Sequence, residues 1–119
     1  RSTEILKLAD GLGIHVAWLP FESEPPRCDL MVSTVPADSL MRRAEDLTAR
    51  ADAVFDVVYD PWPTPLAVAG KIAGATVIDG LDLLAGQAVG QVQLMTGYPV
   101  PMDVLRSTAQ NGLAEHARL

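Results

Sequence analysis

Residues 54–80 read VFDVVYDPWPTPLAVAGKIAGATVIDG, and this stretch decides the expected fold. Residues 54–58 are short, apolar and β-branched, which is typical of a strand, and residues 76–78 have the same character. Between them a proline begins a helix expected over 65–72, and Gly74 ends it. A strand, a helix and a second strand in this order predict a βαβ unit with parallel strands.

The alternation of strands and helices continues on both sides of this unit. The strands are nearly continuous apolar runs, which is typical of parallel sheets that helices cover on both faces. The sequence therefore predicts an α/β fold. Outside the central unit we expect a first helix that stops at 11–13, strands at 14–18 and 29–33 with a loop over 20–27 between them, and helices over about 38–50, 80–95 and 102–114.

The helix expected at 80–95 shows a periodic apolar pattern. Residues spaced three, four and seven apart lie on one side of a helix, so they predict a stripe that packs in a core. The stripe consists of Leu81, Leu84, Ala85, Ala88, Val92 and Met95.

Composition limits the class of protein. The 119 residues are 49% hydrophobic and 20% charged, which suits one globular domain or part of a larger one. No apolar run is long enough to cross a membrane, and the net charge of −6 disfavours nucleic acid as a partner. With a single cysteine, Cys28, no internal disulfide can form, which favours a cytoplasmic protein. Two histidines far from this cysteine predict no metal site.

Ligands of open α/β sheets bind outside the carboxyl ends of the strands, so we place a candidate site there. Thr34, Tyr59 and Gly80 follow the second, third and fourth expected strands. Leu83 and Gln87 come one and two turns after Gly80, and the Gln87 amide can both donate to and accept from hydroxyls or a carboxylate.

Each of these residues also has a purely structural interpretation. Tyr59 could be a surface aromatic, Thr34 a turn residue, Gly80 the start of a helix and Gln87 a solvated side chain. The chain has no Gly-rich phosphate loop, and neither a Ser-His-Asp nor a Lys-Asp set can be assembled. We therefore predict no catalytic residue within this chain.

A resemblance to a known family sharpens the expectation. Asp56-Val-Val-Tyr59-Asp60-Pro61-Trp-Pro-Thr64-Pro65-Leu66 resembles the D-x-x-Y-(N/D)-P-x-x-T-P-L segment of shikimate dehydrogenases, and its Tyr-Asp-Pro-Trp-Pro-Thr-Pro version looks most like actinobacterial members. The resemblance covers essentially all of the chain. The other matching segments are Arg1-Ser2, like the end of N-R-(T/S), Asp29 to Pro36, Gly80-Leu81-x-Leu83-Leu84-x-x-Gln87-Ala88 and Thr96-Gly97.

This resemblance implies an enzyme that reversibly reduces 3-dehydroshikimate to shikimate with NADPH, on the route to chorismate and aromatic amino acids. It implies that Tyr59 and Gln87 contact the substrate. It also implies that Arg1 pairs with the 2′-phosphate of NADP, a group that a guanidinium binds bidentately. The cofactor-binding residues that it implies are Arg1, Ser2, Thr34, Val57, Gly80 and Leu83, the last in place of the family's usual Met.

The family's phosphate loop and its catalytic Lys and Asp have no counterpart in these residues. Residues 1–119 would then be the downstream part of a Rossmann-like NADP-binding domain, inactive alone. Its parallel sheet would be incomplete, with the 14–18 strand apart from the 29–33 strand, and its C-terminal helices would pack back toward a missing substrate domain. The remainder of the parent chain or a second fragment would complete it, and a homodimer is a further expectation.

Two alternatives stay open. Ile5 stands where the family has a second basic residue, so NADP over NAD rests on Arg1, and an NAD-dependent quinate/shikimate dehydrogenase is one alternative. The other is a non-catalytic nucleotide-binding module that reuses the same half-fold.

Overall fold

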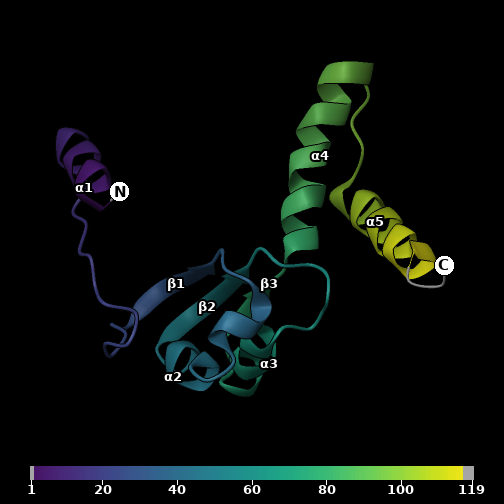
Figure 1. Ribbon diagram of the computed structural model, residues 1–119. Coiled ribbons are helices and arrows are strands. Elements are labelled where there is room, and N and C mark those ends of the chain that lie inside the picture. The colour runs from purple at the N-terminus through teal and green to yellow at the C-terminus, as the bar shows by residue number, and fades with distance from the viewer. Residues whose placement is uncertain (1, 117–119) are drawn as a thin grey trace.

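Three parallel strands form the sheet of the computed structural model, which describes residues 2–116 (Figure 1). They are β1 (Cys28–Ser33), β2 (Ala51–Asp56) and β3 (Thr76–Ile78), in the order β1-β2-β3. β1 pairs with β2 and β2 with β3, both in parallel. The α/β class and the parallel βαβ unit predicted from the sequence are therefore confirmed.

The helices follow the predicted order, with one difference. The stretch expected as one helix over 38–50 consists of a 3-10 turn and a short α-helix, because Met41 and Arg43 bond to carbonyls three residues back instead of four. The helical elements are α1 (Ser2–Gly11), η1 (Ala37–Leu40), α2 (Ala44–Thr48), α3 (Pro65–Ile72), α4 (Gly80–Thr96) and α5 (Met102–His116).

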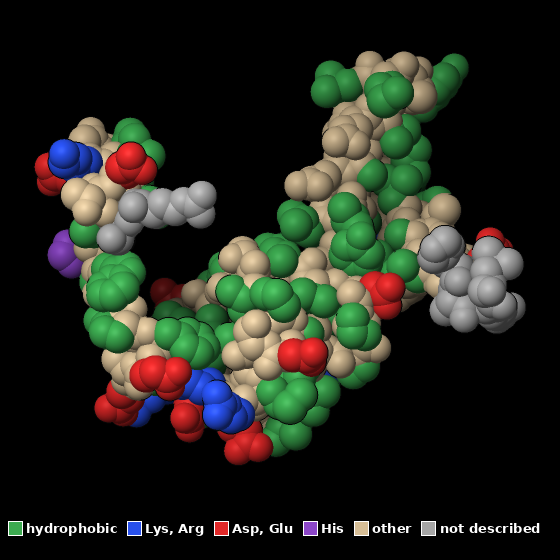
Figure 2. All heavy atoms as spheres, viewed as in Figure 1, with side chains coloured by type: hydrophobic (Ala, Val, Ile, Leu, Met, Phe, Trp, Pro, Cys, Tyr) green, Lys and Arg blue, Asp and Glu red, His purple; other side chains and the backbone are tan. Residues whose placement is uncertain are grey.

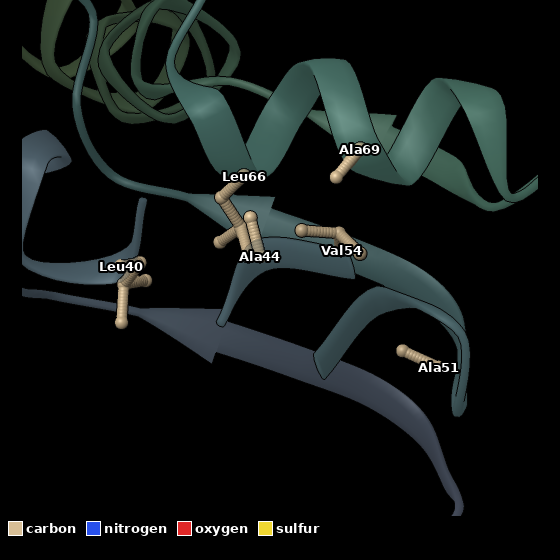
Figure 3. Packing of buried hydrophobic residues seen from close by; sticks show 6 residues of the cluster. All are labelled: Leu40, Ala44, Ala51, Val54, Leu66 and Ala69. Atoms are coloured by element: carbon tan, nitrogen blue, oxygen red, sulfur yellow. The ribbon is translucent and has the colours of Figure 1, made fainter. Parts of the chain in front are cut away.

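The hydrophobic core lies between the sheet and the helices η1, α2 and α3. Val54 in the central strand and Leu66 in α3 are completely or almost completely buried. Figure 3 shows Leu40, Ala44, Leu66 and Ala69 gathered around the strand that carries Val54. On β1, by contrast, Leu30 and Val32 are half exposed, so the described core is built on one face of the sheet.

The strand expected at 14–18 is wrong. These residues have no strand pairing and are exposed, as are residues 3–8 of α1, whereas Ala9 is buried. A strand is held by hydrogen bonds to a neighbouring strand, and within residues 2–116 no strand pairs with this segment. Figure 1 shows α1 and the segment that follows it standing apart from the sheet.

The core stripe expected along α4 is buried only near its beginning. Leu81 and Ala85 are buried, whereas Leu84 and Met95 are exposed. The reason is the direction of α4, which rises away from the sheet with α5 packed beside it (Figure 1). These projections give a radius of gyration of 17.1 Å, where a compact domain of this length has about 13.5 Å.

Candidate functional site

The segments that follow the three strands meet at one edge of the sheet. The Val57 N–H donates to the Ser33 carbonyl at 3.1 Å, which joins the ends of β2 and β1. The Gly80 N–H donates to the Val58 carbonyl at 3.4 Å, which joins the start of α4 to the end of β2. This is the carboxyl edge, where the sequence predicted a ligand site.

A buried hydrogen bond organises the loop that carries Tyr59. Asp56 ends β2 and Thr64 precedes α3, and both are only 1% exposed. The Thr64 hydroxyl donates to Asp56 Oδ2 at 2.7 Å, and the Val58 N–H donates to Asp56 Oδ1 at 3.3 Å. Thr64 Oγ1 also accepts from the Ala67 N–H at 3.1 Å and so caps α3. The two ends of the loop are therefore fixed by one side-chain pair.

Asp56 and Thr64 belong to the segment that resembles the family, but the sequence analysis predicted no role for either. Local sequence features that indicate both roles were nonetheless present. A threonine directly before a proline is an N-cap followed by the N1 position of a helix. A carboxylate at the end of an apolar strand needs a donor if it is buried, and the threonine hydroxyl supplies one.

Gly80 lies against the end of β2 without room for a side chain. An added Cβ would stand 2.2 Å from the Val57 carbonyl oxygen and 2.8 Å from its carbon. Only glycine lets α4 begin this close to the strand. Val57 and Gly80, both predicted as cofactor-binding residues, are thus in direct contact, and the close packing by itself requires a glycine at position 80.

Tyr59 is 42% exposed and borders a cavity of about 400 Å³. The other side chains around this cavity include Trp62, Asp79, Asp82 and Arg106. The cavity separates the Tyr59 loop from the place where α5 meets the start of α4. Tyr59 therefore shares one hollow with charged side chains of both signs.

The first turn of α4 is closed by a reciprocal capping box. The Asp82 N–H donates to Asp79 Oδ1 at 2.8 Å, and the Asp79 N–H donates to Asp82 Oδ2 at 3.1 Å. Arg106 from α5 donates to the remaining oxygen of each carboxylate. Partial burial raises the pKa of Asp82, but the hydrogen bonds from Arg106 and the Asp79 backbone outweigh it and hold the pKa below its ordinary value.

The other predicted site residues lie at different distances from the carboxyl edge of the sheet. Thr34 follows β1 directly and is exposed, and Leu83 and Gln87 are exposed one and two turns along α4. Ser2 begins α1, which stands apart from the sheet, so the structure does not bring it to this edge (Figure 1). Arg1 lies outside the described residues. The structure thus gathers Val57, Tyr59 and Gly80, with Thr34 on the same edge.

A larger cavity, of about 920 Å³, lies at the opposite edge of the sheet. The residues around it include Phe21, Arg43 and Arg50, from segments that precede β1 and β2. Two of its three arginines have partners already: Arg43 donates to the Ser23 carbonyl at 2.9 Å and faces Phe21, and Arg50 pairs with Glu24. We therefore place the candidate site at the carboxyl edge, where polar groups follow all three strands.

In the part of the chain that the structure describes, no helix has both the length and the apolar character needed to span a membrane. Within the same residues, no three His, Cys, Asp or Glu side chains are arranged to hold a metal ion.

Comparisons with known proteins give one consistent result, although no family model matches the chain. It is 35% identical to the NADP-dependent shikimate dehydrogenase of Methanocella arvoryzae over 89 residues, which are 71% of this chain and 33% of that protein. The crystal structure of a shikimate 5-dehydrogenase from Mycobacterium fortuitum matches with a TM-score of 0.76 and 38% identity, over 88% of this chain and 41% of that one. Shikimate dehydrogenase from Mycobacterium tuberculosis matches with a TM-score of 0.63 and 42% identity, over 72% and 32%.

Each of these matches covers less than half of the relative's length. The chain spans about a third of the length of the curated relatives it matches, and its Rossmann-like α/β fold agrees with theirs. Over most of its own length, the chain is therefore similar in sequence and in fold to one part of shikimate dehydrogenases.

Proposed function

We propose that this chain is the downstream part of the NADP-binding domain of a shikimate dehydrogenase, which reversibly reduces 3-dehydroshikimate to shikimate with NADPH. The observation that carries the proposal is the Asp56–Thr64 pair, which fixes the Tyr59 loop beside Gly80 at the carboxyl edge. Similarity to enzymes named NADP-dependent shikimate dehydrogenases supports it.

The described residues suit the nicotinamide end of the cofactor. Val57 is partly exposed, Gly80 is buried against its carbonyl, and Leu83 is partly exposed one turn further on. An uncharged surface of this kind fits a flat ring, which supplies the hydride when the cofactor is bound. These residues would orient the ring and keep water from one of its faces. Thr34 would hold the remainder, with Arg1 on the 2′-phosphate and Ser2 beside it once the rest of the parent protein places α1 at this edge.

Tyr59 and Gln87 are the proposed substrate ligands. Both side chains are exposed, and between them they offer a hydroxyl and an amide that can donate and accept. They would bind the hydroxyls and carboxylate of a cyclic hydroxy acid. We assign no acid or base to this chain, so the catalytic Lys and Asp would come from the parent protein, and this part alone would be inactive.

The parent protein would supply the missing neighbours as well. The exposed apolar residues of 2–27 and of the upper part of α4 support this, as does the share of each relative that the chain covers (Figure 2). The 38% and 42% identity to two mycobacterial structures supports an actinobacterial source. A homodimer and a cytoplasmic location stay predictions.

The first experiment is an intact mass and peptide map of the complete protein, followed by an assay of NADP⁺ reduction with shikimate. We expect a Gly-rich loop and a lysine upstream, and turnover that depends on shikimate. Faster turnover with NAD⁺ and quinate would favour the NAD-dependent alternative. No turnover in the complete protein, with nucleotide still bound, would favour a non-catalytic nucleotide-binding module.

A matched pair of variants then tests the substrate assignment. Gln87→Ala should raise KM for shikimate about tenfold, because a hydrogen-bonding partner of the substrate is lost. Gln93→Ala removes the same amide from an exposed position further along the same helix and should leave KM unchanged. Equal KM values for Gln87→Ala and the wild type would count against Gln87 as a ligand.

A further inference from the structure

We propose that Arg106 is a positioning residue for this site, one that fixes the start of α4 through the two carboxylates of its capping box. The inference rests on the proposed function, because it concerns where Gly80 and its neighbours stand relative to cofactor and substrate. Arg106 belongs to α5, more than twenty residues further along the chain, and the motifs of the sequence do not include it.

The Arg106 guanidinium contacts both carboxylates like a fork, with one nitrogen on each. Arg106 Nε lies 2.5 Å from Asp82 Oδ1, and one terminal nitrogen lies 2.6 Å from Asp79 Oδ2. A planar guanidinium presents its donors in fixed directions and so can hold two acceptors at once, which a lysine cannot do in the same way. All three side chains keep less than a third of their surface exposed, so water competes only in part.

The two carboxylates divide their oxygens without overlap. Asp79 uses Oδ1 for the Asp82 N–H and Oδ2 for Arg106. Asp82 uses Oδ2 for the Asp79 N–H and Oδ1 for Arg106. The capping box brings two negative charges together, and the guanidinium is the cation that compensates them. Arg106 therefore completes the cap and docks α5 on it.

Gly80 lies between the two carboxylates of the capping box in sequence. It directly follows Asp79, and its Cα lies so close to the Val57 carbonyl that no side chain fits. Tyr59 lines the same cavity as Asp79, Asp82 and Arg106. A shift of the capping box would move Gly80 against Val57 and would change the surface offered to the nicotinamide. Small errors in the distance between reacting atoms have large effects on hydride transfer.

The test uses the complete enzyme with Arg106→Met and Arg106→Lys. We expect Arg106→Met to lower kcat about tenfold, with KM for NADP⁺ changed less than about twofold, because the reacting ring is displaced while the other contacts of the cofactor remain. The primary deuterium isotope effect with NADPH deuterated at the transferred position should rise. Arg106→Lys, which keeps the charge but loses the fork, should recover part of kcat.

Arg43→Met is the matched control. Arg43 also donates to a neighbouring residue and lies over an aromatic ring, but at the opposite edge of the sheet. Its kinetic constants and isotope effect should equal those of the wild type. If Arg106→Met does not fold, Arg106→Lys is measured with the same readouts.

The outcomes separate the two proposals. Shikimate-dependent turnover in the wild type with unchanged kcat and isotope effect in the folded Arg106 variants would overturn the positioning role and leave the proposed function intact. A lower melting temperature alone in these variants would overturn it in the same way. Absence of shikimate-dependent turnover in the wild type would overturn the proposed function itself, and the inference with it.

Discussion

Residues 28–80 and residues 2–27 contain similar apolar side chains but bury them very differently. In the first region Leu66 is 1% exposed, packed between α3 and the sheet, while in the second Leu8 is 66% exposed on α1. Both lie on helices with apolar residues at helical spacing. The difference lies in the neighbours. The strands before and after α3, β2 and β3, pair in one sheet against which α3 packs, whereas within the described residues α1 has no sheet to pack against. Apolar residues at helical spacing show which face of a helix can be buried, but the face is buried only where a second element packs against it.

The largest expected effect tests this comparison directly. Leu66→Ala should lower the free energy of unfolding by about 2–5 kcal/mol, because the buried side chain leaves a cavity. Leu8→Ala should cost no more than about 0.5 kcal/mol wherever Leu8 stays exposed. Urea denaturation of both variants measures the difference. An equally large cost for Leu8→Ala in the complete protein would mean that α1 is buried there, against residues outside this chain.

The Asp56–Thr64 pair should give the next effect. Thr64→Val keeps the shape but removes the donor to a buried carboxylate and the cap of α3, so we expect a loss of about 2 kcal/mol. Thr76→Val changes an exposed threonine in β3 and should be almost neutral. Chemical denaturation and kcat are measured for both. A Thr64→Val protein with wild-type stability and turnover would show that the Tyr59 loop does not depend on this bond.

Two glycines of α4 sharpen the comparison between its buried start and its exposed continuation. Gly80→Ala forces a Cβ against the Val57 carbonyl, so the chain must shift at a cost of about 1–3 kcal/mol, with a fall in kcat. At Gly86 an added Cβ would meet only Met102 Cε, at 4.0 Å. Gly86→Ala should therefore stabilise the helix by up to about 1 kcal/mol. Thermal unfolding measures both. Similar signs for the two variants would contradict the packing described for Gly80.

The sequence predicted what depends on local signals. The order β1, β2, α3, β3 follows from apolar runs, from Pro65 at the start of a helix and from Gly74 after it, and all of these are confirmed. The strand at 14–18 was wrong because pairing needs a neighbour that no local pattern reports.

The candidate site divides in the same way. The edge that carries Thr34, Tyr59 and Gly80 follows from the general rule for parallel sheets. The Asp56–Thr64 bond and the Arg106 fork join residues from different elements, so no pattern within one element indicates them. Only the three-dimensional structure shows these contacts.

The smallest expected effect is the pH dependence of the α4–α5 contact. Hydrogen bonds from Arg106 and from the Asp79 backbone hold the pKa of Asp82 below its ordinary value of 3.8, against the opposing effect of partial burial. A carboxylate with a lowered folded-state pKa stabilises the fold above its unfolded-state pKa and loses that contribution as the pH falls through the folded-state value. The stability gap between wild type and Arg106→Met should thus be constant from neutral pH to about pH 5 and should close below about pH 4.

The size of this gap should stay below about 1 kcal/mol, because both partners keep contact with water and screening weakens the pair. Urea denaturation of the two proteins at neutral and acidic pH measures it, and high salt should narrow the gap at neutral pH. A gap that persisted unchanged into acid would show that Arg106 stabilises through the packing of its aliphatic stem. The fork would then contribute geometry to the site without contributing measurable stability to the fold, so the kinetic constants and the isotope effect of the Arg106 variants would be the decisive readout.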